Sequence, residues 1–245
     1  MITSVENKKI KEISKLNNRK YRKEIGLFIV EGEHLVEEAY KHNLLESVYS
    51  LDETDYPNSE LVSENVMRKL SNLDTIPNII GVCKFKSEKE LGNKLLILDD
   101  IQDPGNLGTI IRSAVAFEID TIIVSKETVD LYNPKVLRAT QGMIFNMNII
   151  NRDLVPFILE LKENNYKVYS TNVVNGKEIK TLEKDDKYAI IMGSEGRGVK
   201  EELESMSDAN IYIRMNPLCE SLNAGVSASI LMYELGGKKW KIYHF

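Results

Sequence analysis

The sequence predicts an α/β protein with a parallel sheet, and three observations support this class. Apolar runs of four or five residues alternate with amphipathic stretches along most of the 245 residues. Runs such as 95–98 and 188–192 are apolar on both faces, which is typical of parallel strands covered by helices on both sides. A polar, charged stretch at 86–93 interrupts the alternation. We therefore expect a smaller N-terminal α/β domain at 1–90 and a larger C-terminal domain at 94–245.

The N-terminal part begins with a helical pattern. Ile10, Ile13 and Leu16 recur at helical spacing, so they predict an amphipathic helix with a basic outer face. Ser63 is a candidate N-cap for a later helix. The other elements expected here are strands at 26–30, 45–51 and 79–85 and a helix at 32–41.

The C-terminal part repeats the order of strand and helix. Leu107, Ile110, Ile111 and Ala114 form an apolar stripe, so a helix is expected from about residue 107. Further helices are expected at 133–141, 153–164 and 222–235. Strands are expected at 95–98, 121–125, 144–150, 166–170 and 188–192.

Composition excludes several classes of protein. The chain has 32 Lys and Arg against 37 Asp and Glu, a net charge of −5, so it is not a polycation. No apolar run approaches the roughly 18 residues of a membrane helix, and no secretory signal is present, so we expect a cytoplasmic protein that binds no membrane. Cys83 and Cys219 can form neither a disulfide framework nor a four-cysteine zinc site, so we expect no metal.

Positive charge is concentrated at the N-terminus. Residues 1–25 hold eight basic and three acidic side chains, a surplus of five positive charges on a chain that is otherwise acidic. One interpretation is an ordinary solvated helix face. The other is a surface that contacts the phosphate backbone of RNA. The candidate RNA contacts are Arg19, Lys20, Arg22 and Lys23.

A first cluster of polar residues follows the strand expected at 95–98. Arg112 lies off the apolar stripe of the next helix, on the same face as Gly105, Gly108 and Thr109. Small residues there leave the helix N-terminus open, and free N–H groups beside a guanidinium suit an anion such as phosphate. The alternative is turn chemistry with one surface arginine.

Two more clusters lie near the C-terminus. A glycine-rich turn at 193–198 contains Glu195, but its glycines are too tightly spaced for a dinucleotide motif. Ser221 precedes the last expected helix and is a candidate N-cap for it. That helix is rich in small residues, so we expect it to pack closely against another backbone.

Together, these clusters resemble the three signature motifs of the SpoU (TrmH-like) family of RNA 2′-O-ribose methyltransferases, within the SPOUT class. Motif one corresponds to 106–112, motif two to 193–198 and motif three to 213–226. Residues 137–142 resemble a further family stretch, and 22–32 resemble the start of the substrate-binding domain of rRNA-directed members. Arg214 and Pro217 depart from the usual pattern of motif three.

The resemblance implies a SPOUT-type parallel sheet with a deep trefoil knot, a homodimer paired through the knot, and S-adenosyl-L-methionine (SAM) as cofactor. The implied reaction transfers a methyl group to a ribose 2′-OH, with 23S ribosomal RNA as the expected substrate. The implied cofactor-binding residues are Gly193, Ile213, Leu222, Thr171 and Met215. The implied catalytic residues are Arg112, Asn106, Glu195, Ser221 and Asn223.

Several alternatives stay open at this point. Arg112 is either the base that accepts the ribose proton or a cation that orients the RNA phosphate, since a free guanidinium is always protonated. Glu195 is either part of the site or a structural anchor. The competing functions are a tRNA ribose methyltransferase, a catalytically silent RNA-binding assembly factor and, more distantly, a nucleotide-dependent oxidoreductase.

Overall fold

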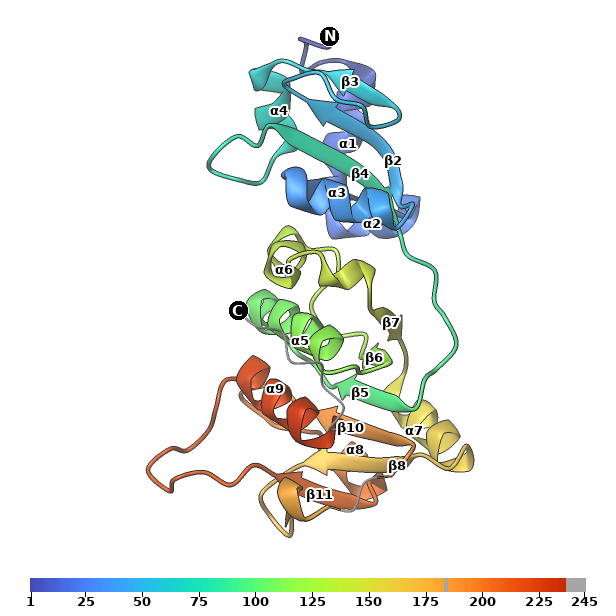
Figure 1. Cartoon of the computed structure of the whole chain (residues 1–245), viewed down its shortest axis with the longest axis vertical. Coiled ribbons are helices and arrows are strands. Elements are labelled where there is room, and N and C mark those ends of the chain that lie inside the picture. The colour runs from blue at the N-terminus through green and yellow to red at the C-terminus, as the bar shows by residue number, and fades with distance from the viewer. Residues whose placement is uncertain (183–184, 237–245) are drawn as a thin grey trace. The chain divides into compact units, whose positions relative to one another are not determined.

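The computed structural model describes residues 1–182 and 185–236, which form two compact units (Figure 1). Unit 1 comprises Met1–Ser87 and Asp130–Asn146, and unit 2 comprises Glu88–Val129 and Met147–Phe245. The end of the expected C-terminal domain, residues 237–245, lies outside the described residues. The segment Asp130–Asn146, which we expected in the C-terminal domain, groups with unit 1 because its side chains pack there.

Unit 1 is built on a four-stranded mixed sheet with the order β1-β4-β2-β3. Strand β4 pairs antiparallel with both β1 and β2, and β3 pairs parallel with β2. The strands are β1 Leu27–Glu31, β2 Leu45–Ser50, β3 Ser59–Leu61 and β4 Ile79–Lys84.

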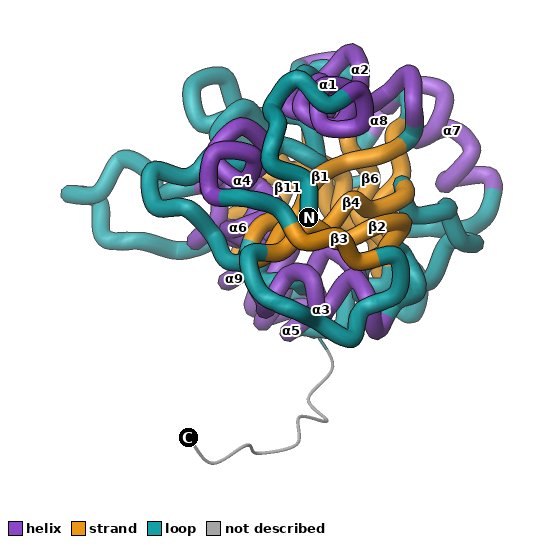
Figure 2. The backbone as a smooth tube through the Cα atoms, turned by 90° about the horizontal axis from the view of Figure 1, so that it is seen from above, coloured by secondary structure: helices purple, strands orange, loops and turns teal. Residues whose placement is uncertain are grey.

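Helices cover both faces of this sheet, as Figure 2 shows. On one face, Ile10, Ile13 and Leu16 pack with Met67 and Leu70 over the strands, so the predicted N-terminal stripe is buried. Helix α3 covers the other face, where Val36 lies against Gly81. The helices are α1 Lys8–Ser14, η1 Lys15–Asn17, α2 Arg19–Ile25, α3 Glu33–Lys41 and α4 Glu64–Leu70.

The segment Asp130–Asn146 adds α6 Pro134–Thr140 and the 3-10 turn η2 Met143–Phe145 to unit 1. The Tyr132 ring stacks on Phe28 and Phe85, with centroids 4.3 Å and 4.2 Å away. Aromatic pairs of this kind bury large apolar areas. The segment is therefore packed against the strands of unit 1.

Unit 2 is built on a seven-stranded sheet with the order β7-β6-β5-β10-β8-β11-β9, and every pairing is parallel. The expected parallel α/β class is confirmed, and the knot implied by the resemblance stays a prediction. The strands are β5 Lys94–Leu98, β6 Thr121–Val124, β7 Asn148–Asn151, β8 Lys167–Thr171, β9 Lys177–Glu178, β10 Tyr188–Met192 and β11 Ala209–Tyr212.

Two helical layers enclose this sheet. Helices α7 and α8 pack on one face, where Phe157 and Leu203 meet Ile97 and Ile191. Helices α5 and α9 pack against each other on the opposite face (Figure 1). Strand residues alternate between the two faces, so Leu96 and Ile190 point toward α5 and α9. The helices are α5 Pro104–Ala116, α7 Leu154–Glu163, α8 Glu201–Met206 and α9 Ala224–Leu235, with a 3-10 turn η3 at Ile179–Thr181.

Most expected elements are present, and three differ in type or by two or more residues at a boundary. Helix α5 begins at Pro104 rather than at about residue 107. Residues 144–150 were expected to be extended, but 143–145 form η2 and only Asn148–Asn151 is a strand. The apolar run there reflects a buried helical turn, and a short run does not distinguish the two states. The last helix begins at Ala224 rather than Leu222. The helices and strands that sequence reasoning missed are α2, α8, β3, β9 and β11.

Candidate functional site

The first motif forms the start of α5. Asp103 is the N-cap, and its Oδ1 accepts a hydrogen bond of 2.7 Å from the backbone N–H of Asn106. Pro104 follows in the first turn, where its missing N–H costs nothing. The Asn106 side chain is buried, with 9% of the residue exposed. The cap therefore fixes where the Asn106 amide lies beyond the end of β5.

The second motif is a tight turn between β10 and α8. A Cβ atom added to Gly193 would lie 1.9 Å from the carbonyl carbon and oxygen of Gly198, so only glycine fits there. Gly198 has a φ of +71°, and its N–H donates to the Ser194 carbonyl at 2.9 Å. The glycines are needed for this close backbone approach, which also places Glu195 on the turn.

The third motif ends in the N-cap of α9. Asn223 Oδ1 accepts hydrogen bonds from the N–H groups of Gly225 at 2.9 Å and Val226 at 3.3 Å. The prediction that Ser221 caps this helix is wrong, because Asn223 fills that role two residues later. Ser221 is instead exposed in the preceding loop.

Asn106 joins the three motifs through its side-chain amide. Its Oδ1 accepts a hydrogen bond of 2.7 Å from Asn223 Nδ2, and its Nδ2 donates to Glu195 Oε1. Asn223 Oδ1 accepts the hydrogen bonds that cap α9, so Asn223 Nδ2 is the atom that faces Asn106. The orientation of both side-chain amides is therefore determined. Three segments that are far apart in the sequence thus hold one carboxylate, Glu195, in place.

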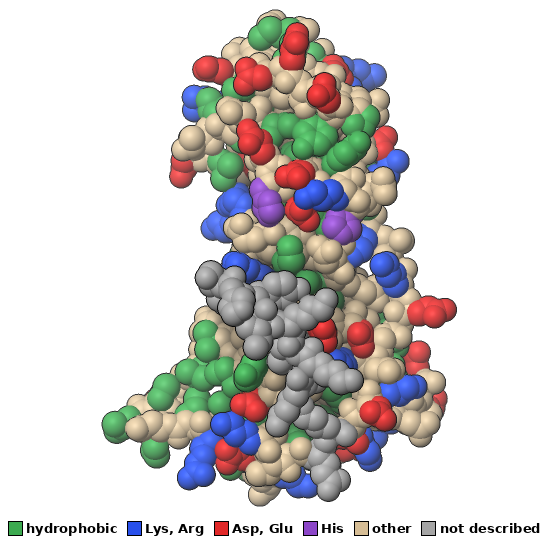
Figure 3. All heavy atoms as spheres, viewed as in Figure 1, with side chains coloured by type: hydrophobic (Ala, Val, Ile, Leu, Met, Phe, Trp, Pro, Cys, Tyr) green, Lys and Arg blue, Asp and Glu red, His purple; other side chains and the backbone are tan. Residues whose placement is uncertain are grey.

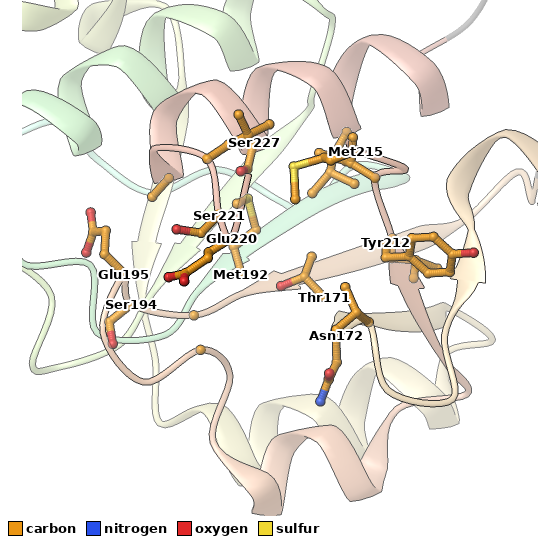
Figure 4. Close-up of a pocket in the computed structure, with 18 residues that line it drawn as sticks. Thr171, Asn172, Met192, Ser194, Glu195, Tyr212, Met215, Glu220, Ser221 and Ser227 are labelled. Atoms are coloured by element: carbon orange, nitrogen blue, oxygen red, sulfur yellow. The ribbon is translucent and has the colours of Figure 1, made fainter. Parts of the chain in front are cut away.

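A cavity of about 310 Å³ lies beside this chain of hydrogen bonds. Its wall includes every residue expected to bind cofactor, namely Thr171, Gly193, Ile213, Met215 and Leu222, together with Glu195 and Ser221. Met192 and Leu231 extend its apolar surface. In Figure 4, Glu195 and Ser194 lie at one end of the cavity and Tyr212 and Met215 at the other.

Sequence reasoning missed five polar residues of the cavity wall, which are Asn172, Ser194, Tyr212, Glu220 and Ser227. Asn172 follows β8 and Tyr212 ends β11, and these two strands are neighbours in the sheet. The carboxyl ends of adjacent parallel strands meet at one edge. The sequence did not reveal this neighbourhood, because β11 was not predicted as a strand.

Arg112 lies outside the cavity wall. It is exposed on α5 and makes no hydrogen bond or ion pair within residues 1–182 and 185–236 that the structure describes. The expectation that the helix face beside Arg112 is open is wrong in part. Gly108 is buried, and Thr109 lies against α9, where a Cβ on Gly225 would come within 3.1 Å of it. The expected close packing of α9 is confirmed, with Ser113 Oγ and Ser229 Oγ 2.7 Å apart.

An ionic network fixes the end of the glycine turn against β5. The N–H of Lys200 donates to Asp99 Oδ2 at 3.0 Å, and Lys200 Nζ lies 2.9 Å from Asp100 Oδ2. The hydrogen bond to Asp100 raises the pKa of Lys200. Burial alone would raise the pKa of Asp100, but the hydrogen bonds from Lys200 and Ser125 lower it below its ordinary value. Asp100 also holds a left-handed φ of 60°, which a non-glycine residue adopts only when its surroundings enforce it.

The basic N-terminal segment divides into exposed and neutralised side chains. Arg19, Lys20 and Lys23 are exposed on α2. The prediction for Arg22 is wrong, because this residue is only 4% exposed and pairs with Asp130 inside unit 1. Its Nη1 also donates to the Leu16 carbonyl at 2.7 Å, so the guanidinium is fully engaged.

The described residues hold neither a candidate metal site nor a membrane-spanning helix. Among them, no group of three or more His, Cys, Asp or Glu side chains is placed to hold a metal ion. No helix within the described ranges is long and apolar enough to cross a membrane. The expectation that the protein needs no metal stays a prediction.

Comparison with known proteins assigns the two parts of the sequence. The model of the SpoU rRNA methylase family matches residues 93–233, and that of the MRM3-like substrate binding domain matches 7–81. The chain is 37% identical over 245 residues to the Bacillus subtilis 23S rRNA (guanosine(2553)-2′-O)-methyltransferase RlmP, covering 96% of this chain and 99% of the relative.

Solved structures agree with this assignment. The AdoMet-bound rRNA methyltransferase from Sinorhizobium meliloti superposes with a TM-score of 0.85 at 26% identity, covering 96% of each chain. An RNA 2′-O ribose methyltransferase superposes with a TM-score of 0.80 at 27% identity, over 96% of this chain and 97% of the other. The three motifs, the parallel sheet and these matches agree, and the chain belongs to the SpoU rRNA methylase family.

Proposed function

We propose that this chain is a SAM-dependent RNA methyltransferase that methylates the ribose 2′-OH of a guanosine in 23S rRNA. The observation that carries this proposal is the hydrogen-bond chain from Asn223 through Asn106 to Glu195 beside the 310 Å³ cavity. The B. subtilis relative, matched over nearly its whole length, is named for guanosine 2553 of 23S rRNA. The equivalent guanosine is therefore the first candidate target.

The cavity suits SAM in its chemistry. A neutral adenine needs an apolar wall and backbone hydrogen-bonding groups, which Ile213, Leu222 and the backbone at Gly193 supply. When bound, SAM supplies a methyl group on a cationic sulfur that is a good leaving group. What this chain must add is the correct placement of the ribose hydroxyl and a destination for its proton.

Arg112 is proposed as the residue that acts on the RNA. Its exposure and its lack of any partner among the described residues leave the guanidinium free to meet a phosphate or a ribose. Two roles follow, a base in its neutral form or a cation that orients the phosphate, and both need the planar guanidinium. Glu195, Asn106, Asn223 and Ser221 are proposed to orient the loops and the ribose around it.

Residues 1–90 are proposed as the RNA substrate-binding domain and 94–245 as the catalytic domain. The exposed side chains Arg19, Lys20 and Lys23 would contact phosphates. The enzyme would act in the cytoplasm, where ribosomes are assembled, and without a metal. Calorimetry in EDTA should therefore show S-adenosylhomocysteine (SAH) binding unchanged.

A homodimer through the α5–α9 side of unit 2 is part of the proposal. Val226 and Tyr233 are exposed on α9, and Leu218 in the loop before it is 93% exposed. Figure 3 shows hydrophobic side chains gathered on that loop. Exposed apolar groups of this kind favour association. Light scattering at micromolar concentration should give twice the mass of one chain, and a monomer alone would contradict the dimer.

The function is tested by incubating the protein with labelled SAM and separate 23S rRNA, 16S rRNA and tRNA. The proposal expects label in 23S rRNA, removed when the candidate guanosine is replaced. Label in tRNA alone would favour the tRNA enzyme. Binding of RNA and SAM with no transfer to any RNA would favour the silent assembly factor.

A further inference from the structure

The cavity wall carries an uneven charge. Among its eighteen described residues, two are carboxylates, Glu195 and Glu220, and none is Lys, Arg or His. Figure 4 shows both carboxylates at the same end of the cavity. The resulting negative potential favours a cationic ligand at that end.

The two carboxylates are not equivalent. Glu195 Oε1 accepts the Asn106 amide, so its position belongs to the chain that joins the three motifs. Glu220 is exposed, and within the described part of the chain no hydrogen bond or ion pair engages its carboxylate. Glu220 therefore presents an uncompensated charge to whatever occupies the cavity.

The orientation of the cofactor follows from the proposed function. The reacting methyl group must meet the ribose near Arg112 and Asn106, both on α5. Asn106 contacts Glu195, so the sulfur of the cofactor belongs at the Glu195 end of the cavity, where Glu220 also lies. The sulfur is cationic in SAM. It is neutral in SAH, because the electron pair of the broken S–CH₃ bond stays on sulfur.

We propose that the Glu220 carboxylate attracts the positively charged sulfur of SAM. The cavity therefore binds the substrate SAM more tightly than the product SAH. This inference rests on the proposed function. A carboxylate near a sulfonium attracts it, and the attraction vanishes once the methyl group and its positive charge are gone. Glu220 therefore strengthens the binding of SAM and not that of SAH, so that fresh SAM displaces the product more readily after transfer.

Calorimetry with full-length wild type and Glu220→Gln tests the inference on three ligands: SAM, SAH and sinefungin, which carries an amine where SAM carries the methylated sulfur. The Gln variant should bind SAM and sinefungin roughly threefold to fivefold more weakly, since the pair is partly exposed to water. SAH affinity should change by less than about twofold, because its sulfur has no charge to lose. Glu220→Asp should restore most of the preference for SAM.

Two controls sharpen the test. Glu201→Gln removes an exposed carboxylate of α8 that is not part of the cavity wall, and it should leave all three affinities unchanged. Raising salt from about 0.05 M to about 0.5 M should reduce the preference for SAM in the wild type and not in Glu220→Gln, because salt screens exposed charges.

Several outcomes would overturn the inference. Equal weakening of SAM and SAH in Glu220→Gln would show that Glu220 only shapes the loop, and unchanged affinity for both would show that it faces no charge. A wild type that binds neither SAM nor SAH would instead contradict the proposed function itself, so the two failures are distinguishable.

Discussion

Two arginines, one in each unit, have opposite surroundings. Arg112 on α5 is exposed and has no partner among the described residues, whereas Arg22 on α2 is buried and paired with Asp130. Both were expected to meet RNA. The difference teaches that a local surplus of charge does not show which of its side chains are free to bind RNA. A charge count cannot tell a phosphate contact from a structural ion pair.

The same contrast holds for the regions around them. Backbone turns and hydrogen-bonded side-chain amides form the cavity of unit 2. Single substitutions there should therefore change SAM affinity or turnover. Half of the eight basic side chains of residues 1–25 are paired, Lys9, Lys11 and Lys15 each with a glutamate and Arg22 with Asp130. Substitutions in unit 1 should therefore change stability or the salt dependence of RNA binding.

The largest effect is expected for Arg112→Ala. Turnover should fall by about 10²–10⁴-fold, the usual contribution of a positioned proton-transfer group. SAM affinity and thermal stability should stay near wild type, because the side chain is exposed and lies outside the cavity wall. Arg112→Lys should not rescue turnover, since a point charge does not reproduce the planar guanidinium. Normal turnover of the alanine variant would refute the assignment.

Arg22→Ala should show the opposite behaviour. It leaves the Asp130 carboxylate, whose side chain is only 10% exposed, without its cation, which should cost about 3–5 kcal/mol of stability in urea unfolding. Lys20→Ala, on the exposed side of the same helix, should change stability by less than about 0.5 kcal/mol.

A double variant separates the two interpretations of Arg22. Replacing both partners with apolar residues, Arg22→Met with Asp130→Leu, should recover most of the lost stability. If Arg22→Ala instead left stability unchanged and weakened RNA binding, the structural role would be wrong.

Substitution of Asn223 tests the hydrogen-bond chain from Asn223 through Asn106 to Glu195, and a smaller effect is expected. Asn223→Asp keeps the oxygen that caps α9 but replaces the Nδ2 donor to Asn106 with an acceptor. It should keep the cap, lose about 1 kcal/mol of stability and lose roughly tenfold in turnover, since the buried Asn106 oxygen is left without its donor. Asn223→Ala should lose the cap as well, at about 1 kcal/mol. Equal turnover in wild type and Asn223→Asp would show that the chain does not position the site.

The smallest expected effect concerns the basic segment. Replacing Arg19, Lys20 and Lys23 together with serine should lower the slope of log affinity against log salt by about 2, roughly 0.7 for each single-stranded phosphate contact. The matched control replaces Lys9, Lys11 and Lys15, which already pair with carboxylates. If both triple variants give the wild-type slope, the segment is only solvated surface.

Much of the fold and site could be predicted from the sequence. Strands such as β5 and β10 were found because they are apolar on both faces. The motifs located Asn106, Glu195 and Asn223 because their residue types and order are specific. These are the features that local pattern and chemistry encode.

The remaining features depend on packing that the sequence does not display. Asn172 and Tyr212 entered the cavity wall only through the neighbourhood of β8 and β11. Arg22 was misjudged because its partner, Asp130, lies 108 positions away. Ser221 was preferred to Asn223 as a cap because both residue types suit that position, and only the hydrogen bonds decide between them.

The central claim is that the chain places a methyl group from SAM on a ribose hydroxyl, and one measurement tests it most directly. After 23S rRNA is incubated with methyl-labelled SAM and the enzyme, complete alkaline hydrolysis separates the products, because a 2′-O-methyl group prevents cleavage of its own linkage. The label should appear in an alkali-resistant dinucleotide containing guanosine, and Arg112→Ala should form this product at least about 100-fold more slowly. Label recovered entirely in mononucleotides would place the methyl group on a base and contradict the account.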